Sequence, residues 1–150
     1  EHPMYNRILI ATDGSELSHK AVDHAIGLAA LCQAELIAVT VVPHYPRSYF
    51  DGSLPLTNDE VERVEKHWSE GGHKILETVQ TAAKAQGVTL SDVVVKSDLV
   101  ADALIETAKT QKADLIVMAS HGRKGMSRLL LGSETQQVLT HTSIPVLVLR

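Results

Sequence analysis

Three runs of consecutive apolar residues constrain the fold more than any other feature of the sequence. They cover residues 8–11, 36–39 and 115–118, and none of them alternates with polar side chains. A strand that is apolar on both sides must be covered on both faces, which is the environment of a parallel sheet between layers of helices. The runs therefore predict buried parallel strands.

Helical patterns separate these runs and extend the alternation along the chain. We expect strands near residues 5–11, 35–42, 92–96, 114–119 and 145–149. We expect helices near residues 15–32, 58–86, 99–111 and 134–142. A strict alternation of strand and helix predicts an α/β fold with a doubly wound five-stranded parallel sheet, strand order 3-2-1-4-5, and helices on both faces.

Local signals mark several boundaries of these elements. Thr57 and Glu60 have the spacing of a capping box at the start of the second helix, and Gly87 is placed to end that helix. The pair Gly71-Gly72 predicts a bend or loosening inside it. The segment from Pro43 to Pro55 predicts a flexible surface loop.

The composition limits the kind of protein that the chain can be. A length of 150 residues with 44% apolar side chains predicts one domain spanning residues 1–150, with 1–3 as a disordered or non-native extension. The only cysteine, Cys32, excludes a disulfide framework. The net charge of −4 and the scarcity of aromatic residues argue against nucleic-acid binding. Because no apolar segment is long enough for a membrane span, we expect a cytoplasmic protein.

Two loops are expected to meet where the strand order reverses, between the first and fourth strands, and ligands bind at such a point. One contains Thr12 to Ser15. The other lies within residues 119–133, which hold three cations and no acid, while the remaining residues carry 11 Lys+Arg against 18 Asp+Glu. Glycines in this loop and the following helix start favour an anion site. Ser133 and Gln136 also form a possible capping box, so a purely structural role stays open.

The segments 8–15, 113–123 and 131–148 resemble the universal stress protein family over nearly the whole chain from Met4. Nucleotide-binding members carry G-x-x-G, nine residues, then G-[S/T]. This sequence has Gly122, nine residues and then Gly132-Ser133, with Ala119 in place of the first glycine.

The resemblance implies a site for ATP or AMP. It places Asp13 beside the adenine or ribose, where an Asx turn or a cap of the first helix is the structural alternative. It frames the base with the backbone of Ala11, Thr12 and Val41 and lines the ribose side with Met118 and Ala119. The residues implied to hold the phosphates are Gly122, Arg123, Gly132, Ser133 and Thr135. Magnesium would enter with the phosphates, beside Asp13 and Thr135.

The resulting hypothesis is a cytoplasmic ATP- or AMP-binding regulatory protein of the stress response, with protein partners that the sequence does not identify. It is not expected to be an enzyme, because a Walker A loop is missing, although weak ATP hydrolysis stays open. One alternative is a dimeric stress-response protein that binds no nucleotide. Another is an adenylate-forming or ATP-hydrolysing enzyme.

A homodimer is expected through the strand at 145–149. In the predicted strand order this apolar strand lies at the edge of the sheet, where its unpaired backbone groups can pair with the same strand of a second subunit. The resemblance implies a similar dimer.

Overall fold

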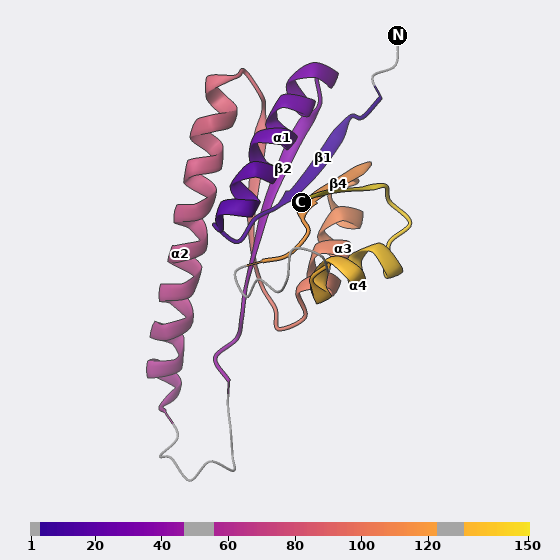
Figure 1. Ribbon diagram of the computed structural model, residues 1–150. Coiled ribbons are helices and arrows are strands. Elements are labelled where there is room, and N and C mark those ends of the chain that lie inside the picture. The colour runs from indigo at the N-terminus through magenta and orange to yellow at the C-terminus, as the bar shows by residue number, and fades with distance from the viewer. Residues whose placement is uncertain (1–3, 47–55, 123–130) are drawn as a thin grey trace.

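Parallel strands form a single sheet with helices on both faces (Figure 1). The structure is a computed structural model that describes residues 4–46, 56–122 and 131–150. The elements are β1 (Arg7–Ala11), α1 (Glu16–Cys32), β2 (Glu35–Val42), α2 (Asn58–Ala85), β3 (Leu90–Lys96), α3 (Val100–Thr110), β4 (Leu115–Ala119), α4 (Ser133–His141) and β5 (Val146–Leu149). The five-stranded sheet has the order β3-β2-β1-β4-β5, which confirms the predicted topology.

Three parts of the predictions lie outside the described residues. These are the extension at residues 1–3, residues 47–55 of the predicted surface loop, and Arg123 with the rest of residues 123–130.

The strand β1 lies at the centre of the sheet, between β2 and β4. Ile8 is in register with Leu36 on one side and with Leu115 on the other. Successive residues of β1 point into different layers, since Ile8 and Ile10 belong to one buried cluster and Leu9 to another. This placement explains why the strand is apolar throughout.

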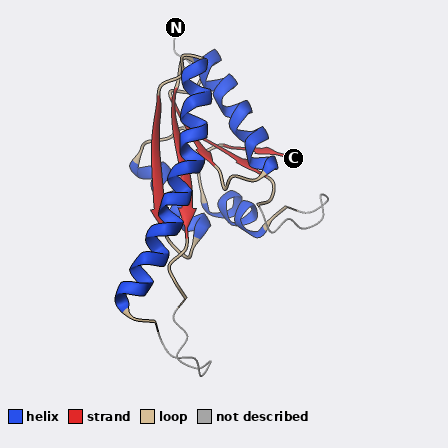
Figure 2. Cartoon of the chain, turned by 90° about the vertical axis from the view of Figure 1, so that its left-hand side faces the viewer, coloured by secondary structure: helices blue, strands red, loops and turns tan. Residues whose placement is uncertain are grey.

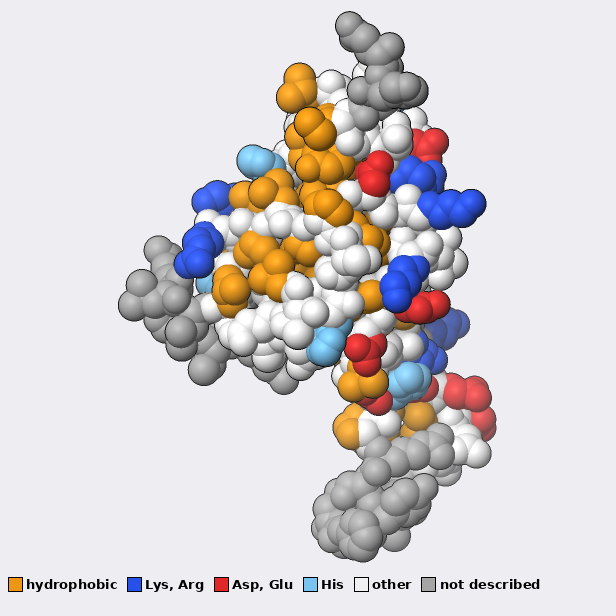
Figure 3. Space-filling model, turned by 90° about the vertical axis from the view of Figure 1, so that its right-hand side faces the viewer, with side chains coloured by type: hydrophobic (Ala, Val, Ile, Leu, Met, Phe, Trp, Pro, Cys, Tyr) orange, Lys and Arg blue, Asp and Glu red, His pale blue; other side chains and the backbone are white. Residues whose placement is uncertain are grey.

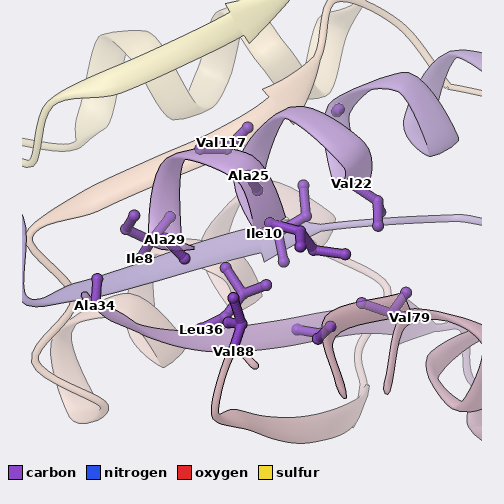
Figure 4. Close-up of a cluster of buried hydrophobic side chains, with 14 of the residues drawn as sticks. Ile8, Ile10, Val22, Ala25, Ala29, Ala34, Leu36, Val79, Val88 and Val117 are labelled. Carbon is purple, nitrogen blue, oxygen red and sulfur yellow. The ribbon is translucent and has the colours of Figure 1, made fainter. Parts of the chain in front are cut away.

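The first cluster lies beneath α1 and α2. Ala25 and Ala29 of α1 and Val79 of α2 pack against strand residues such as Ile8 and Leu36. Figure 4 shows these side chains converging between the helices and the sheet, and Figure 2 shows the two helices on the same face. Full burial of an aliphatic side chain of this size stabilises the fold by about 1.5–3 kcal/mol.

The second cluster lies on the opposite face, beneath α3 and α4. Leu104 of α3 and Val138 of α4 pack against Leu9, Ile37 and the buried side chain of Met118. The two helices also pack against each other. Because α3 follows β3 and α4 follows β4, both helices begin at the carboxyl edge of the sheet.

Both predicted ends of α2 are confirmed. The hydroxyl of Thr57 accepts a hydrogen bond from the backbone N–H of Glu60, and the Glu60 carboxylate accepts one from the N–H of Thr57, at 3.2 and 2.8 Å. At the other end, Gly87 follows the helix with a φ of +70°, a conformation that glycine adopts without strain.

The predicted loosening at Gly71-Gly72 is wrong, because α2 runs through both residues as one helix (Figure 1). Gly72 is buried against the sheet. A Cβ atom at this position would lie 2.9 Å from Thr40 Cγ2 and 3.3 Å from side-chain carbons of Val42 and Val94. The glycine therefore allows α2 to approach β2 and β3 closely, and this packing holds the helix together where its intrinsic propensity is low.

Within the described residues, no helix has the length and apolar character needed to cross a lipid bilayer.

Candidate functional site

The two loops predicted to meet at the reversal of strand order lie in contact. Asp13 follows β1, Gly122 follows β4, and β1 and β4 are paired neighbours. A Cβ atom added to Gly122 would lie 2.7 Å from Asp13 Oδ2. A larger residue at position 122 would therefore displace the carboxylate of Asp13 from this place beside the second loop.

The local geometry of Asp13 is the Asx turn considered as the structural alternative. Its Oδ1 accepts a hydrogen bond from the backbone N–H of Ser15 at 2.9 Å. The cap of α1 is Ser15, whose hydroxyl accepts from the N–H of Ser18 at 3.3 Å. Gly14 completes the turn with a φ of +79°. The turn orients Asp13 so that its second oxygen faces Gly122.

A cavity of about 910 Å³ opens at this point, along the carboxyl edge of the sheet. Every described residue of the predicted site lines it: Ala11, Thr12, Asp13, Val41, Met118, Ala119, Gly122, Gly132, Ser133 and Thr135. Arg123, the remaining predicted residue, lies outside the described part of the chain. The topology thus brings together residues from four separate segments of the sequence.

The N-terminus of α4 forms one side of the cavity. The predicted capping box of Ser133 and Gln136 is wrong: the N-cap is Gly132, the helix begins at Ser133, and no described side chain caps it. The backbone N–H of Gly132 is held by the carbonyl of Ser120 at 2.7 Å. The side-chain amide of Gln136 instead donates to the carbonyl of Leu131 at 2.8 Å. The first-turn N–H groups of α4 are thus left without a side-chain cap at the cavity wall.

Gly132 fits closely against the preceding loop. A Cβ atom there would lie 3.2 Å from the Cα of His121 and 3.3 Å from the carbonyl oxygen of Ser120. These neighbours are backbone or near-backbone atoms, which cannot move aside as the end of a flexible side chain can. The close fit of this glycine fixes the position of the α4 N-terminus relative to the end of β4.

Thr135 has a different role from the predicted one. Its hydroxyl donates hydrogen bonds to the carbonyls of Ala119 and Ser120, at 3.0 and 3.1 Å, and the residue is buried. Because this hydroxyl proton is shared between two carbonyls, it is not available to donate to a phosphate. Thr135 positions α4 on β4, and only its backbone N–H is suited to an anion.

The opposite side of the cavity was missed by the sequence reasoning. It is formed by residues that follow β2 and β3 or begin α3: Pro43, Ser97, Asp98, Val100 and Leu104. The carboxyl ends of parallel strands meet at one edge of the sheet. The residues that follow β2 and β3 could therefore have been predicted to line the same cavity. Apart from Asp98 and Ser97 this side is apolar.

Asp98 is held in place by His44. Asp98 Oδ1 accepts a hydrogen bond from the backbone N–H of His44 at 2.9 Å, and His44 Nδ1 lies 3.3 Å from Oδ2. Both residues are partly exposed. The pair joins the segment after β2 to the turn between β3 and α3.

The neighbouring segment is fixed to α2. Glu65 accepts a hydrogen bond from the backbone N–H of Tyr45 at 2.9 Å and lies 3.6 Å from Lys96. The hydrogen bond from Tyr45, assisted by the positive charge of Lys96, lowers the pKa of Glu65 below its ordinary value. The ring of Tyr45 also stacks on Trp68 with centroids 6.2 Å apart. These contacts hold the cavity rim near β2 against the long helix.

The described residues contain no group of three or more His, Cys, Asp or Glu side chains arranged to hold a metal ion. The acidic residues Asp13, Asp98 and Glu134 and the histidine His121 are among the residues that line the cavity. His121 Nδ1 lies 3.1 Å from the hydroxyl of Ser120. Ser120 is buried and is absent from the residues that line the cavity, so this pair presents no nucleophile to a ligand there.

Comparison with known proteins identifies the family of this chain. The profile described as the universal stress protein family matches residues 4–150. The chain belongs to the universal stress protein family. Universal stress protein MJ0531 of Methanocaldococcus jannaschii is 36% identical over 147 residues, which cover 98% of this chain and 83% of the relative.

Solved structures of the family share the fold. The universal stress protein UspA from Lactobacillus plantarum superimposes with a TM-score of 0.83 at 22% identity, covering 97% of this chain and 98% of its own. A universal stress protein crystallised in complex with cAMP superimposes with a TM-score of 0.67 at 30% identity, covering 97% of both chains.

Proposed function

We propose that this universal stress protein is a regulatory protein of the stress response that binds ATP or AMP in the cavity between Asp13 and α4. The observation that carries the proposal is the N-terminus of α4, which no described side chain caps and which faces a cavity of about 910 Å³ whose other side is largely apolar. A nucleotide combines an anionic end with an apolar base, and the two sides of the cavity match these two parts.

The phosphates are assigned to the start of α4. The N–H groups of Ser133, Glu134 and Thr135 belong to its first turn, where the helix dipole and the unpaired donors favour an anion. Gly132 lets the phosphate approach the backbone, since no side chain projects from this position. The three cations in residues 119–133 of the sequence add positive charge to this part of the chain.

The base and ribose are assigned to the ends of the central strands. The apolar residues Val41 and Met118 line the cavity, as do Ala11, the last residue of β1, and Thr12, which follows it. Ala119 lines the cavity and 9% of the residue is exposed, so alanine takes the place of the family glycine without closing the cavity. Asp13, placed at the boundary with the phosphate side, is suited to accept hydrogen bonds from ribose hydroxyls.

The family comparison supports an adenine nucleotide. The relative in complex with cAMP is 30% identical to this chain along nearly its whole length. cAMP shares the adenine and ribose of ATP and AMP and carries a single phosphate group. The same division of a cavity into an apolar side and an anion-binding side serves all three ligands.

Magnesium is proposed to enter with the phosphates, as it does in many nucleotide sites. Asp13 is the protein oxygen ligand best placed for it, because its carboxylate lies beside Gly122 at the phosphate side. Thr135, the other predicted ligand, is less suited because its hydroxyl is bonded to two backbone carbonyls. We expect Mg²⁺ to strengthen ATP binding more than AMP binding.

We propose binding rather than catalysis as the activity. Ser15 uses its hydroxyl to cap α1, and the Ser133 hydroxyl donates to Glu134 at 3.2 Å. Within the described part of the chain, neither serine is hydrogen-bonded to a histidine that could activate it. A regulatory function of this kind requires access to cellular nucleotide, and we therefore expect the protein in the cytoplasm.

Calorimetric titration with ATP and AMP, with and without Mg²⁺, tests this function. We expect saturable binding of one nucleotide per chain and a rise in the unfolding temperature. Absence of both signals at millimolar nucleotide, in protein shown by its absorbance to carry no co-purified nucleotide, would overturn the proposal. It would leave a stress-response interaction protein that binds no nucleotide.

A homodimer through β5 is a separate part of the proposed function. β5 is an edge strand in the sheet, and its four residues Val146–Leu149 are only partly buried. Hydrophobic side chains gather on the face that Figure 3 shows, the right-hand side of Figure 1. Pairing of two β5 strands would satisfy their backbone groups and cover apolar surface.

Light scattering coupled to size exclusion measures the mass of the assembly. We expect the parent protein to elute as a dimer and Val148→Lys to shift it toward the monomer, because a charge would be buried against the second subunit. A parent protein that stays monomeric at high concentration would contradict the β5 dimer and leave the nucleotide proposal unaffected.

A further inference from the structure

We propose that the carboxylate of Glu134 competes with the phosphates of a bound nucleotide for the start of α4. It thereby lowers the affinity most for the ligand that carries the most negative charge. The inference rests on the proposed function, since it requires a nucleotide in the cavity. It gives a specificity-determining role to a side chain that neither the sequence motif nor the contacts assigned to the nucleotide include.

Glu134 interrupts a part of the chain that is otherwise free of negative side chains. Residues 115–133 contain three Lys or Arg and no Asp or Glu, and Glu134 is the first acid after Asp114. It is the second residue of α4, and both Glu134 and its neighbour Ser133 line the cavity. An acidic residue therefore occupies the helix turn to which the phosphates are assigned.

A hydrogen bond shows where the carboxylate lies. The hydroxyl of Ser133, the first residue of α4, donates to Glu134 Oε2 at 3.2 Å. The carboxylate therefore lies beside the first residue of the helix, where the helix dipole favours a negative charge. In this conformation Glu134 supplies that charge and also occupies the hydroxyl of Ser133. A phosphate at the same helix start would use both features.

The helix turn that carries Glu134 is fixed on both sides. The backbone N–H of Gly132 donates to the carbonyl of Ser120 at 2.7 Å. The hydroxyl of the buried Thr135 donates to the same carbonyl at 3.1 Å. Because these contacts hold the turn against the end of β4, Glu134 can move away only by changing its side-chain conformation. A phosphate that reaches this turn must therefore separate Glu134 from Ser133 or bind beside its charge.

The size of the effect follows from charge and exposure. Ser133 and Glu134 are both exposed, so water and salt screen the repulsion between the carboxylate and a phosphate. AMP carries close to two negative charges at pH 7 and ATP carries more. We expect removal of the Glu134 charge to raise the affinity for AMP about threefold and for ATP without Mg²⁺ about tenfold. Adenosine has no phosphate, and its affinity should not change.

Calorimetric titrations with adenosine, AMP and ATP, with and without Mg²⁺, test this inference. The parent protein is compared with Glu134→Gln, which keeps the size of the side chain and removes its charge. Asp59→Asn is the matched control, because Asp59 is an exposed acid at the second residue of α2 and does not line the cavity. It should keep the parent affinity for all three ligands. Mg²⁺ should reduce the gain for ATP, because the ion neutralises part of the phosphate charge.

The stability of the two variants separates this role from a structural one. Both substitutions remove a negative charge from the first turn of a helix, where it interacts favourably with the helix dipole. We expect each to lower the unfolding temperature by about 1–3 °C, followed by the fluorescence of Trp68, the single tryptophan. Glu134→Gln should therefore combine lower stability with tighter binding of nucleotides, whereas structural damage at the site would weaken binding.

Four results would overturn the inference. If the parent binds AMP and ATP and Glu134→Gln binds them no more tightly, the proposed function stands and Glu134 does not compete. If adenosine gains as much affinity as ATP, the side chain does not act on the phosphates. If Glu134→Gln weakens ATP binding in the presence of Mg²⁺, the carboxylate is a metal ligand instead of a competitor. If the parent binds no nucleotide, the proposed function fails and the inference fails with it.

Discussion

The starts of α2 and α4 satisfy their backbone donors in opposite ways. At α2, Thr57 and Glu60 exchange two hydrogen bonds and close the end of the helix. At α4, the N-cap is Gly132, which offers no side chain, and none of the described side chains takes its place. The first helix start is complete within the chain, whereas none of the described side chains completes the second.

A glycine within α2 and the N-cap glycine of α4 show the same contrast. Gly72 of α2 is required because the side chains of β2 and β3 fill the space beside it. Gly132 is tightly placed against His121 and Ser120 on one side and lines the cavity on the other. The first glycine serves packing, and the second positions a helix start that stays accessible. The difference between the two helices therefore separates residues needed for stability from residues needed for a ligand.

The largest effect is expected from closing the open helix start with a charge. Gly132→Asp would place a carboxylate at the N-cap, where it would accept from the same N–H groups that we assign to the phosphate and would repel the anion. We expect nucleotide affinity to fall by roughly a hundredfold, measured by calorimetry. The added Cβ atom would also lie 3.2 Å from the Cα of His121, so unfolding followed by Trp68 fluorescence has to show that the variant is folded before the two affinities are compared.

Gly71→Asp provides the matched control. It makes the same substitution in α2, at an exposed position where an added Cβ atom meets nothing within 4 Å. This variant should keep the parent affinity. If Gly132→Asp also binds ATP as tightly as the parent, the phosphate does not lie at the α4 start.

A smaller effect, on stability alone, is expected from the packing glycine. Gly72→Ala would place a methyl group 2.9 Å from Thr40 Cγ2, which forces α2 away from the sheet. We expect the free energy of unfolding to fall by about 1–3 kcal/mol in urea titrations followed by Trp68 fluorescence, with nucleotide affinity unchanged.

The neighbouring glycine sharpens this comparison. At Gly71 the same change meets open space, so Gly71→Ala should raise the free energy of unfolding by up to about 1 kcal/mol through helix propensity. Equal effects at the two positions would mean that close packing of α2 against β2 and β3 contributes little.

The smallest effect is expected from opening the closed helix start. Thr57→Ala removes the hydroxyl that accepts from Glu60 and should lower the free energy of unfolding by about 1 kcal/mol. Nucleotide affinity should not change, because Thr57 does not line the cavity. If Thr57→Ala changed the nucleotide affinity, the starts of α2 and α4 would be coupled rather than independent.

The sequence by itself determined the order of the elements, the topology of the sheet and most of one side of the cavity. Continuous apolar runs such as residues 8–11 identify buried strands, because the pattern depends only on the covering of both faces. The capping box was equally predictable from the sequence, because Thr57 and Glu60 are only three residues apart and interact locally. Asp13 and Gly122 could be paired because each directly follows one of two adjacent central strands.

Only the tertiary structure decided the features that depend on contacts between distant segments. Ser133 matches a capping pattern, yet the carbonyl of Ser120 binds the N–H of Gly132 and sets the helix start one residue earlier. Gly72 reads as a helix breaker until the sheet beneath it is known. Asp98 reaches the cavity rim because His44, 54 residues earlier in the chain, holds its carboxylate there. Local patterns record the preferences of neighbouring residues, whereas these positions are fixed by atoms that the fold alone brings within contact distance.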